Sequence, residues 1–248
     1  MPFFRAFDID LPRALREQLV EAFSQLETGA LNPANVNQVP VQRGVYQLYF
    51  DEQLVYVGKA DRLRTRLTKH MRKIQGRTNL EISQMSFKCL YMSANWSTLA
   101  PESQLIALYK SQGTAFWNGN GFGPNDPGAG REDRNKPPAY FDQQYPIREN
   151  WPCDFIVAGD WAVVNLLRSM KRDLPFLLRF QKTSPDYANV SIEVPSTGMP
   201  ASELLRMAAT SLPQGWQATR FPSHMILYKR IREFQFGTVI YPEIGPLD

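Results

Sequence analysis

The sequence predicts an α+β protein made of two parts. Two short β-rich runs follow each other at 44–50 and 54–58, and the stretches around them carry apolar residues at helical spacing. Beyond about residue 152, helical and β-rich stretches alternate again without repeating the first part. We therefore expect one domain over 1–152 and a second α+β domain over 153–248.

The composition is that of an ordinary globular protein. The chain has 248 residues, of which 43% are hydrophobic and 12% aromatic, enough for substantial cores. The two cysteines lie far apart and lack metal-ligand spacing, which argues against structural zinc and a disulfide scaffold. The beginning of the chain resembles no signal peptide, and no apolar run is long enough to span a membrane. The sequence therefore predicts a soluble, cytoplasmic protein.

The first expected element is a helix over 11–28. Asp10 precedes it and Pro12 falls in its first turn, a pair typical of a helix start. Apolar residues then recur at helical spacing up to Gly29. The stretch 30–43 shows no periodicity, and we expect a connecting segment without regular structure.

The two β-rich runs form an expected hairpin, and a basic helix follows over 60–74. The apolar residues of this helix predict a buried stripe: Leu63, Leu67, Met71 and Ile74. Arg62, Arg66 and His70 are spaced four apart, and we expect them on another face of the helix.

The remaining elements follow from composition and spacing. A strand is expected at 85–92, a helix at 101–111, and a long glycine- and proline-rich loop at 113–138. In the second domain we expect two helices, at 160–172 and 201–212. Strands are expected there at 175–181, 190–194, 216–221 and 225–230.

Positive charge is concentrated in one stretch, although the formal net charge is only +4. Between 59 and 73 the chain has one acidic residue, Asp61, among seven basic ones: Lys59, Arg62, Arg64, Arg66, Lys69, Arg72 and Lys73. Such a cluster indicates a surface for a polyanion. The alternative is an ordinary solvated helix face.

The residue types around this cluster suit hydrolysis of a phosphodiester. Tyr46 and Tyr56, on adjacent strands, can direct two phenols to one spot, and a nearby cation such as Lys59 or Arg66 can lower a phenol pKa. His70 can accept a proton, and Glu102 is the single carboxylate of its region, suited to a hydrated Mg²⁺. Taken singly, each has a structural explanation, since strand tyrosines pack and a glutamate suits a helix start. The ordered set favours a nuclease.

These residues follow one another in a recognisable order: Gly44-Val45-Tyr46, Tyr56-Val57-Gly58-Lys59-Ala60, Arg66, His70, Glu102 and Asn118. The order resembles the GIY-YIG nuclease family. Many members carry tyrosine at the position of His70. A histidine at this position resembles the restriction-endonuclease branch. The stretches 121–131 and 140–151 resemble the loop and the closing segment of type II members. The resemblance covers about residues 8–152 and leaves the second domain outside it.

The resemblance implies a small mixed sheet flanked by helices and a role for each site residue. Tyr46 is the implied base or its direct partner, and Tyr56 orients water and phosphate. The other implied roles are phosphate contact for Lys59 and Arg66, proton acceptance for His70, metal binding for Glu102, and a stabilising role for Asn118. Asn120 is a second candidate for that asparagine. The implied cofactor is Mg²⁺, which Mn²⁺ can replace, and the implied products carry a 5′ phosphate and a 3′ hydroxyl.

The implied partner is double-stranded DNA, cut by a homodimer because one site cuts one strand. DNA contacts are expected from the basic helix and from the loop: Arg62, Arg64, Lys69, Arg72, Lys73, Asn120, Asn125, Asp126, Arg131 and Arg134. A companion methyltransferase would protect host DNA. Two alternatives stay open: a phage- or plasmid-defence nuclease directed by its C-terminal domain, and a catalytically silent DNA-binding protein. The C-terminal domain itself could serve DNA recognition, dimerisation or another partner.

Overall fold

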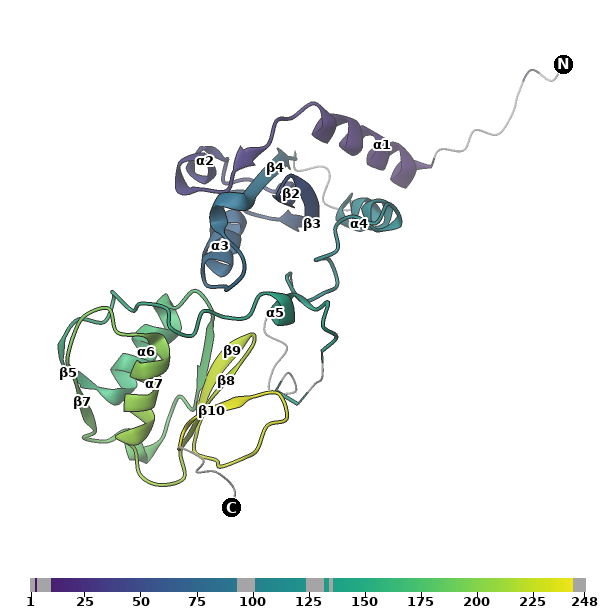
Figure 1. Ribbon diagram of the computed structural model, residues 1–248. Coiled ribbons are helices and arrows are strands. Elements are labelled where there is room, and N and C mark those ends of the chain that lie inside the picture. Colours follow the sequence, from purple (N-terminus) through teal and green to yellow (C-terminus); the bar gives the residue numbers. More distant parts are fainter. Residues whose placement is uncertain (1–2, 4–9, 93–100, 124–131, 134–135, 243–248) are drawn as a thin grey trace. The chain divides into compact units, whose positions relative to one another are not determined.

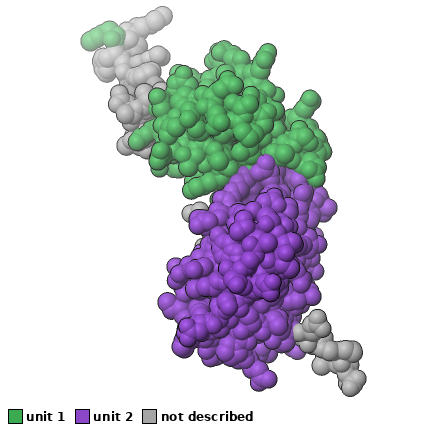
Figure 2. Space-filling view, turned by 90° about the vertical axis from the view of Figure 1, so that its left-hand side faces the viewer, with its two compact units in different colours: residues 1–71, 81–123 green, residues 72–80, 124–248 purple. Residues whose placement is uncertain are grey.

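The computed structural model describes residue 3 and the ranges 10–92, 101–123, 132–133 and 136–242; of 101, 102 and 104 it describes only the backbone. The chain divides into two compact units (Figure 2), one over 1–71 and 81–123 and the other over 72–80 and 124–248. This division differs from the expected boundary at 152. Residues 124–152 and the short stretch 72–80 group with the C-terminal part.

The first unit combines helices with one sheet. Its elements are α1 (Leu11–Ser24), β1 (Gly29–Ala30), α2 (Pro33–Gln38), β2 (Gly44–Phe50), β3 (Gln53–Ala60), the greater part of α3 (Leu63–Gln75), η1 (Ile82–Gln84), β4 (Met85–Tyr91) and α4 (Pro101–Ser111). The strand order is β1-β4-β2-β3, and every pairing is antiparallel. The expectation of an α+β fold is confirmed, but the sheet is antiparallel rather than mixed.

Local signals explain where the helices begin. The Asp10 carboxylate accepts a hydrogen bond from the backbone N–H of Arg13 at 3.0 Å and caps α1, as the sequence predicted. Asn32 caps α2 in the same way, accepting from the N–H of Asn35 at 2.9 Å, and Pro33 is its first residue. We predicted a connecting segment over 30–43 and missed this helix. Six residues are too few for apolar side chains to recur visibly at helical spacing.

The helices α1 and α4 cover one face of this sheet. Apolar side chains from both helices and from β2 and β3 form the core between them: Leu15, Leu19, Phe23, Val45, Val57 and Leu105. Because side chains alternate along a strand, residues 46, 56 and 58 belong to the opposite face. That opposite face carries the candidate site.

The buried stripe of α3 differs from the one expected. Leu63, Leu67 and Ile74 are fully buried as predicted, but Met71 is half-buried and His70 is only 5% exposed. His70 therefore belongs to the buried stripe, and the prediction that it lies on a separate face with Arg62 and Arg66 was wrong. The reason is an aromatic side chain distant in the sequence, described below, which covers the imidazole.

The second unit is built around a four-stranded sheet of order β10-β8-β9-β6. Its elements are α5 (Phe141–Gln144), β5 (Gly159–Ala162), α6 (Val163–Asp173), β6 (Leu177–Phe180), η4 (Pro185–Tyr187), β7 (Ser191–Val194), α7 (Ala201–Thr210), β8 (Gln217–Phe221), β9 (His224–Tyr228) and β10 (Thr238–Tyr241). The pair β6–β9 is parallel, and β5 and β7 form a separate antiparallel ribbon. The helices α6 and α7 pack together on a common core (Figure 1).

Most elements of this unit lie where the sequence predicts them. The exceptions are β5, whose residues pair with β7 where we expected the first turn of a helix, and β10, which we did not expect. Both are short strands of four residues that depend on partners distant in sequence. Among the helices of the described part of the chain, none has the length and apolarity needed to cross a membrane.

Candidate active site

The hairpin of β2 and β3 brings Tyr46 and Tyr56 together on one face. Tyr46 lies opposite Gly58 and Tyr56 lies opposite Leu48, so the two tyrosines are diagonal neighbours with ring centroids 6.0 Å apart. A Cβ at position 58 would overlap the Tyr46 hydroxyl and would lie 2.8 Å from the Tyr56 ring. Glycine at position 58 is therefore what leaves room for both phenols.

His70 completes this group from α3. Its Nε2 forms a 2.7 Å hydrogen bond with the Tyr46 hydroxyl, and its ring centroid lies 5.6 Å from that of Tyr56. Both Tyr46 and His70 are buried, so the bond is shielded from bulk water. A phenol and an imidazole at this distance can exchange a proton.

Phe122 and Gly123 close the group from a different part of the chain. The Phe122 ring stacks on His70 with centroids 4.8 Å apart and planes at 16°, and it meets the edge of Tyr56 at 5.0 Å. A Cβ at Gly123 would overlap the Tyr56 hydroxyl. Sequence reasoning missed both residues, because it assigned the glycine-rich stretch beyond Asn118 to DNA contact. The aromatic residue between Gly121 and Gly123 was the available signal.

Asn118 fixes the edge of the sheet beside these residues. Its side-chain amide donates to the carbonyl of Val57 and accepts from the N–H of Val57, both at 2.8 Å, and it is 6% exposed. The preceding residues Ala115 and Trp117 bond to the carbonyls of Leu54 and Val55. Since β3 is the edge strand, this segment covers backbone groups that would otherwise lack partners. Asn120, in contrast, donates to the carbonyl of Phe116 at 2.7 Å.

The two expected phosphate cations lie in different surroundings. Arg66 is half-buried on α3, one turn before His70, and helix residues four apart are neighbours. Lys59 is exposed near the end of β3, where it pairs with Val45 and so shares the face of Val57 rather than that of Tyr56. Strand alternation by itself does not bring Lys59 to the tyrosines.

Glu102, the expected metal ligand, lies in the first turn of α4, and its side chain is outside the described part of the structure. In the ranges that are described, no group of three or more His, Cys, Asp or Glu side chains could hold a metal ion. A hydrated Mg²⁺ often keeps several waters and takes only one or two carboxylates, so a lone glutamate is a suitable donor.

The expected DNA-contacting residues separate into three groups. Arg62 and Lys69 are exposed on α3. Three others have structural partners: Arg64 donates to the carbonyl of Val39 at 2.7 Å, Arg72 donates to the carbonyls of Arg172 and Leu174, and Lys73 lies over the ring of Phe141. The loop residues Asn125, Asp126, Arg131 and Arg134 lie outside the described residues.

Comparison with known proteins agrees with this geometry. Residues 51–151 match the family model described as the Eco29kI GIY-YIG domain. The match begins in the turn between β2 and β3 and runs past α5, so it crosses from the first compact unit into the second. No curated protein matched the chain. The stretch from 51 to 151 is therefore similar to a GIY-YIG domain of a restriction-endonuclease family.

Proposed function

We propose that this chain is a Mg²⁺-dependent endonuclease that cuts double-stranded DNA at a specific sequence. The observation that carries the proposal is the buried hydrogen bond between Tyr46 and His70, beside Tyr56. It supplies an acid–base pair, which hydrolysis by water requires. The domain match supports the nuclease class.

The proton leaves the attacking water through this pair. Tyr46 accepts the proton of the water as its own phenolic proton passes to His70 across the 2.7 Å bond. Tyr56 orients the water and the phosphate, and its ring is held by Phe122. Covering His70 with Phe122 keeps competing water away from the imidazole.

Charge on the phosphate is balanced by cations next to the pair. Arg66 lies on α3 one turn before His70 and contacts a nonbridging oxygen of the phosphate. Lys59 is a second, more distant candidate for this contact. Glu102 would hold Mg²⁺, which Mn²⁺ can replace and which, when bound, stabilises the leaving 3′ oxygen. The products are a 5′ phosphate and a 3′ hydroxyl.

Cutting both strands of a palindrome requires two copies of the site, so the active form on DNA is a homodimer. Arg62 and Lys69, exposed on α3, contact DNA phosphates. Asn120 and the residues Asn125, Asp126, Arg131 and Arg134 read base edges or neighbouring phosphates. A companion methyltransferase protects host DNA from such an enzyme.

A digestion of unmethylated phage DNA tests the proposal. Purified wild type, Tyr46→Phe and Tyr49→Phe are incubated with the DNA and Mg²⁺, and fragment ends are sequenced. Tyr49 is a matched control, since it lies on β2, donates to Gln47 at 2.5 Å, and burial together with Tyr109 raises its pKa to about 12. We expect discrete fragments from wild type and Tyr49→Phe, and a rate about 10²–10⁴ lower for Tyr46→Phe.

Other outcomes separate the alternatives. A smear of fragments from wild type would contradict sequence-specific cleavage and would favour a less specific defence nuclease. If wild type binds DNA but does not cleave it in Mg²⁺ or in Mn²⁺, the chain is a catalytically silent DNA-binding protein. An equal loss of cleavage rate in Tyr46→Phe and Tyr49→Phe would contradict the role of the Tyr46–His70 hydrogen bond. Glu102→Ala, run alongside, should abolish cleavage but keep DNA binding within about tenfold, because binding is spread over many phosphates.

A further inference from the structure

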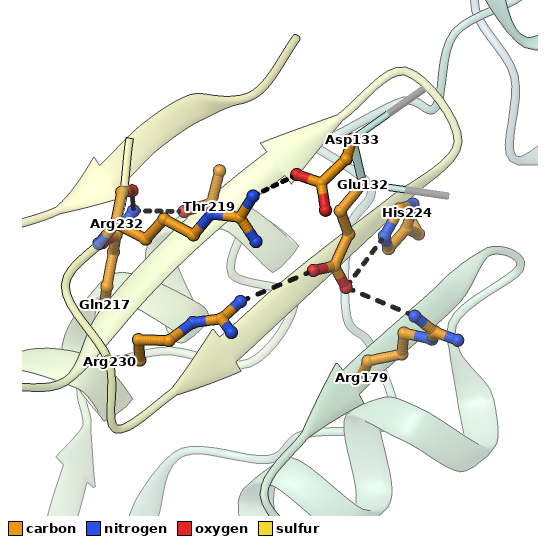
Figure 3. A network of polar contacts seen from close by, with 8 residues as sticks. All are labelled: Glu132, Asp133, Arg179, Gln217, Thr219, His224, Arg230 and Arg232. Carbon is orange, nitrogen blue, oxygen red and sulfur yellow. Dashed lines mark hydrogen bonds and ion pairs between the residues drawn. The ribbon is translucent and has the colours of Figure 1, made fainter. Parts of the chain in front are cut away.

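A buried carboxylate in the second unit is surrounded by basic side chains. Glu132 is 1% exposed, and its carboxylate lies 3.3 Å from Arg179, 3.9 Å from His224 and 4.0 Å from Arg230 (Figure 3). Arg179 and His224 are largely buried as well, whereas the Arg230 side chain is 52% exposed. A buried carboxylate needs such partners, because transfer of an isolated charge out of water is strongly unfavourable.

The basic side chains around Glu132 are themselves held in place. Arg179 lies on β6 and His224 on β9, two strands that pair in parallel. Ser223 forms a 2.8 Å hydrogen bond with Nδ1 of His224, and the imidazole stacks on Phe221 at 4.8 Å. Because both basic side chains are fixed to the sheet, the position of the Glu132 carboxylate is fixed too.

The next residue is attached to the same sheet. The carboxylate of Asp133 accepts a hydrogen bond from Arg232 at 2.5 Å (Figure 3). Gln217 of β8 holds the backbone of Arg232, accepting from its N–H at 2.6 Å and donating to its carbonyl at 2.8 Å. The chain is thus attached to the sheet of the second unit at two successive acidic residues.

A second fastening follows shortly after. Asp142, also 1% exposed, lies 3.0 Å from Arg77 and 3.7 Å from Lys136. Glu132 and Asp142 therefore hold both ends of the segment 132–142 to other parts of the second unit. Neither carboxylate belongs to the acid–base group of the first unit, and the proposed mechanism uses neither of them.

The charge state of Glu132 fits a permanent ion pair. Burial alone would raise the pKa of Glu132, but the nearby His224 and Arg179 hold it below the ordinary value. The carboxylate stays ionised at neutral pH. Glu132 lies within the loop 113–138, between Arg131 and Arg134, to which we assign base reading, and this position gives the ion pair a consequence beyond stability.

We propose that Glu132 is a positioning residue: its contacts with Arg179 and His224 fix residue 132, between Arg131 and Arg134 of the base-reading loop, to the C-terminal sheet. The second unit thereby takes part in DNA sequence recognition without contributing to phosphodiester chemistry. This inference rests on the proposed function for its DNA half. The anchoring half can be measured without DNA.

Limited proteolysis tests the anchor. Trypsin can cut after Arg134, and Arg179→Gln removes the main cation of Glu132 without altering the residues at that bond. Asp186→Asn is the control, because Asp186 pairs with Lys229 at 2.8 Å in the same unit but does not adjoin the segment 132–142. Cleavage after Arg134 should be about tenfold faster in Arg179→Gln than in wild type or Asp186→Asn. Equal rates in the three proteins would overturn the anchor.

Digestion of unmethylated phage DNA tests the recognition half with the same proteins plus Glu132→Gln. We expect Glu132→Gln and Arg179→Gln to cut at additional sites, with the ratio of kcat/KM at the main site to that at single-mismatch sites lowered about tenfold or more. Their kcat at the main site should stay within about threefold, since the chemistry is untouched. An unchanged fragment pattern, or the same loss in Asp186→Asn, would overturn the inference. Failure of wild type to cut would contradict the proposed function, while proteolysis would still decide the anchor.

Discussion

The two histidines of this chain are buried in similar packing but have different partners. His70 stacks on Phe122 and His224 stacks on Phe221, in both cases with ring centroids 4.8 Å apart. Nε2 of His70 meets the phenol of Tyr46, whereas Nε2 of His224 faces the carboxylate of Glu132. A stacked, buried imidazole is therefore a general packing solution in this protein, and the partner of its Nε2 distinguishes the two sites.

The difference shows how burial can serve chemistry or position. A phenol is neutral at ordinary pH, so its bond to His70 leaves a proton that can move during a reaction. The carboxylate of Glu132 is already ionised and is also paired with Arg179, so its contact with His224 is static. We expect substitutions in the first pair to change rates and substitutions in the second pair to change stability and position.

The largest expected effect comes from replacing each histidine separately with glutamine. His70→Gln should lower kcat for DNA cleavage by about 10²–10⁴, because the proton acceptor of Tyr46 is lost. His224→Gln should leave kcat within about threefold at a temperature where the variant is folded. Single-turnover cleavage at saturating Mg²⁺ measures both. Similar rate losses in the two variants would remove the distinction drawn between the sites.

The same pair of variants should differ in stability in the opposite sense. His224→Gln removes a buried imidazole beside the Glu132 carboxylate, and a buried polar group that loses one of its partners costs about 1–3 kcal/mol. His70→Gln removes one hydrogen bond, worth about 0.5–1.5 kcal/mol, plus part of the ring packing. Urea unfolding followed by tryptophan fluorescence measures the two free energies of unfolding. A larger loss in His70→Gln would show that the Tyr46 pair also serves stability.

The first site was largely predictable because its signals are local. The alternation of β2 and β3 places Tyr46 and Tyr56 on one face, and helical spacing brings His70 to the same region. The fold around it, including α1, β4 and α4, follows from caps and periodicity in the same way. The sequence did not predict the surroundings of His70, since nothing in its own helix indicates that Phe122 covers the imidazole.

The second site was not predictable from the sequence. Glu132, Arg179 and His224 come from three distant segments and share no spacing that periodicity could reveal. His224 lies in an apolar strand and Glu132 in a polar stretch, so each looks ordinary alone. Only the parallel pairing of β6 with β9 brings Arg179 and His224 together, and such long-range pairing is the part of a fold that local patterns specify least.

A smaller effect distinguishes the two asparagines considered for the site. Asn118→Ala would leave the N–H and carbonyl of the fully buried Val57 without their side-chain partners, at about 1–3 kcal/mol for each group. Asn120→Ala removes one partly exposed bond and should cost under about 1 kcal/mol. Thermal unfolding of the two variants measures the difference. Equal shifts in Tm would contradict the role of Asn118 in holding the edge of β3.

The smallest expected effect is a change in the pH dependence of stability. The pKa of Glu132 is lower in the folded protein than its ordinary value, so its ion pairs stabilise the fold above about pH 4.3 and this contribution is lost as the pH falls through the folded pKa. The groups facing it are Arg179, His224 and Arg230. Urea unfolding between about pH 7 and pH 3 should show Glu132→Gln less stable than wild type at neutral pH, with the difference decreasing toward the acidic end. Glu193→Gln, on the exposed face of β7, should follow wild type throughout. A difference between wild type and Glu132→Gln that does not change with pH would mean that packing of the side chain, rather than its charge, holds this segment to the sheet.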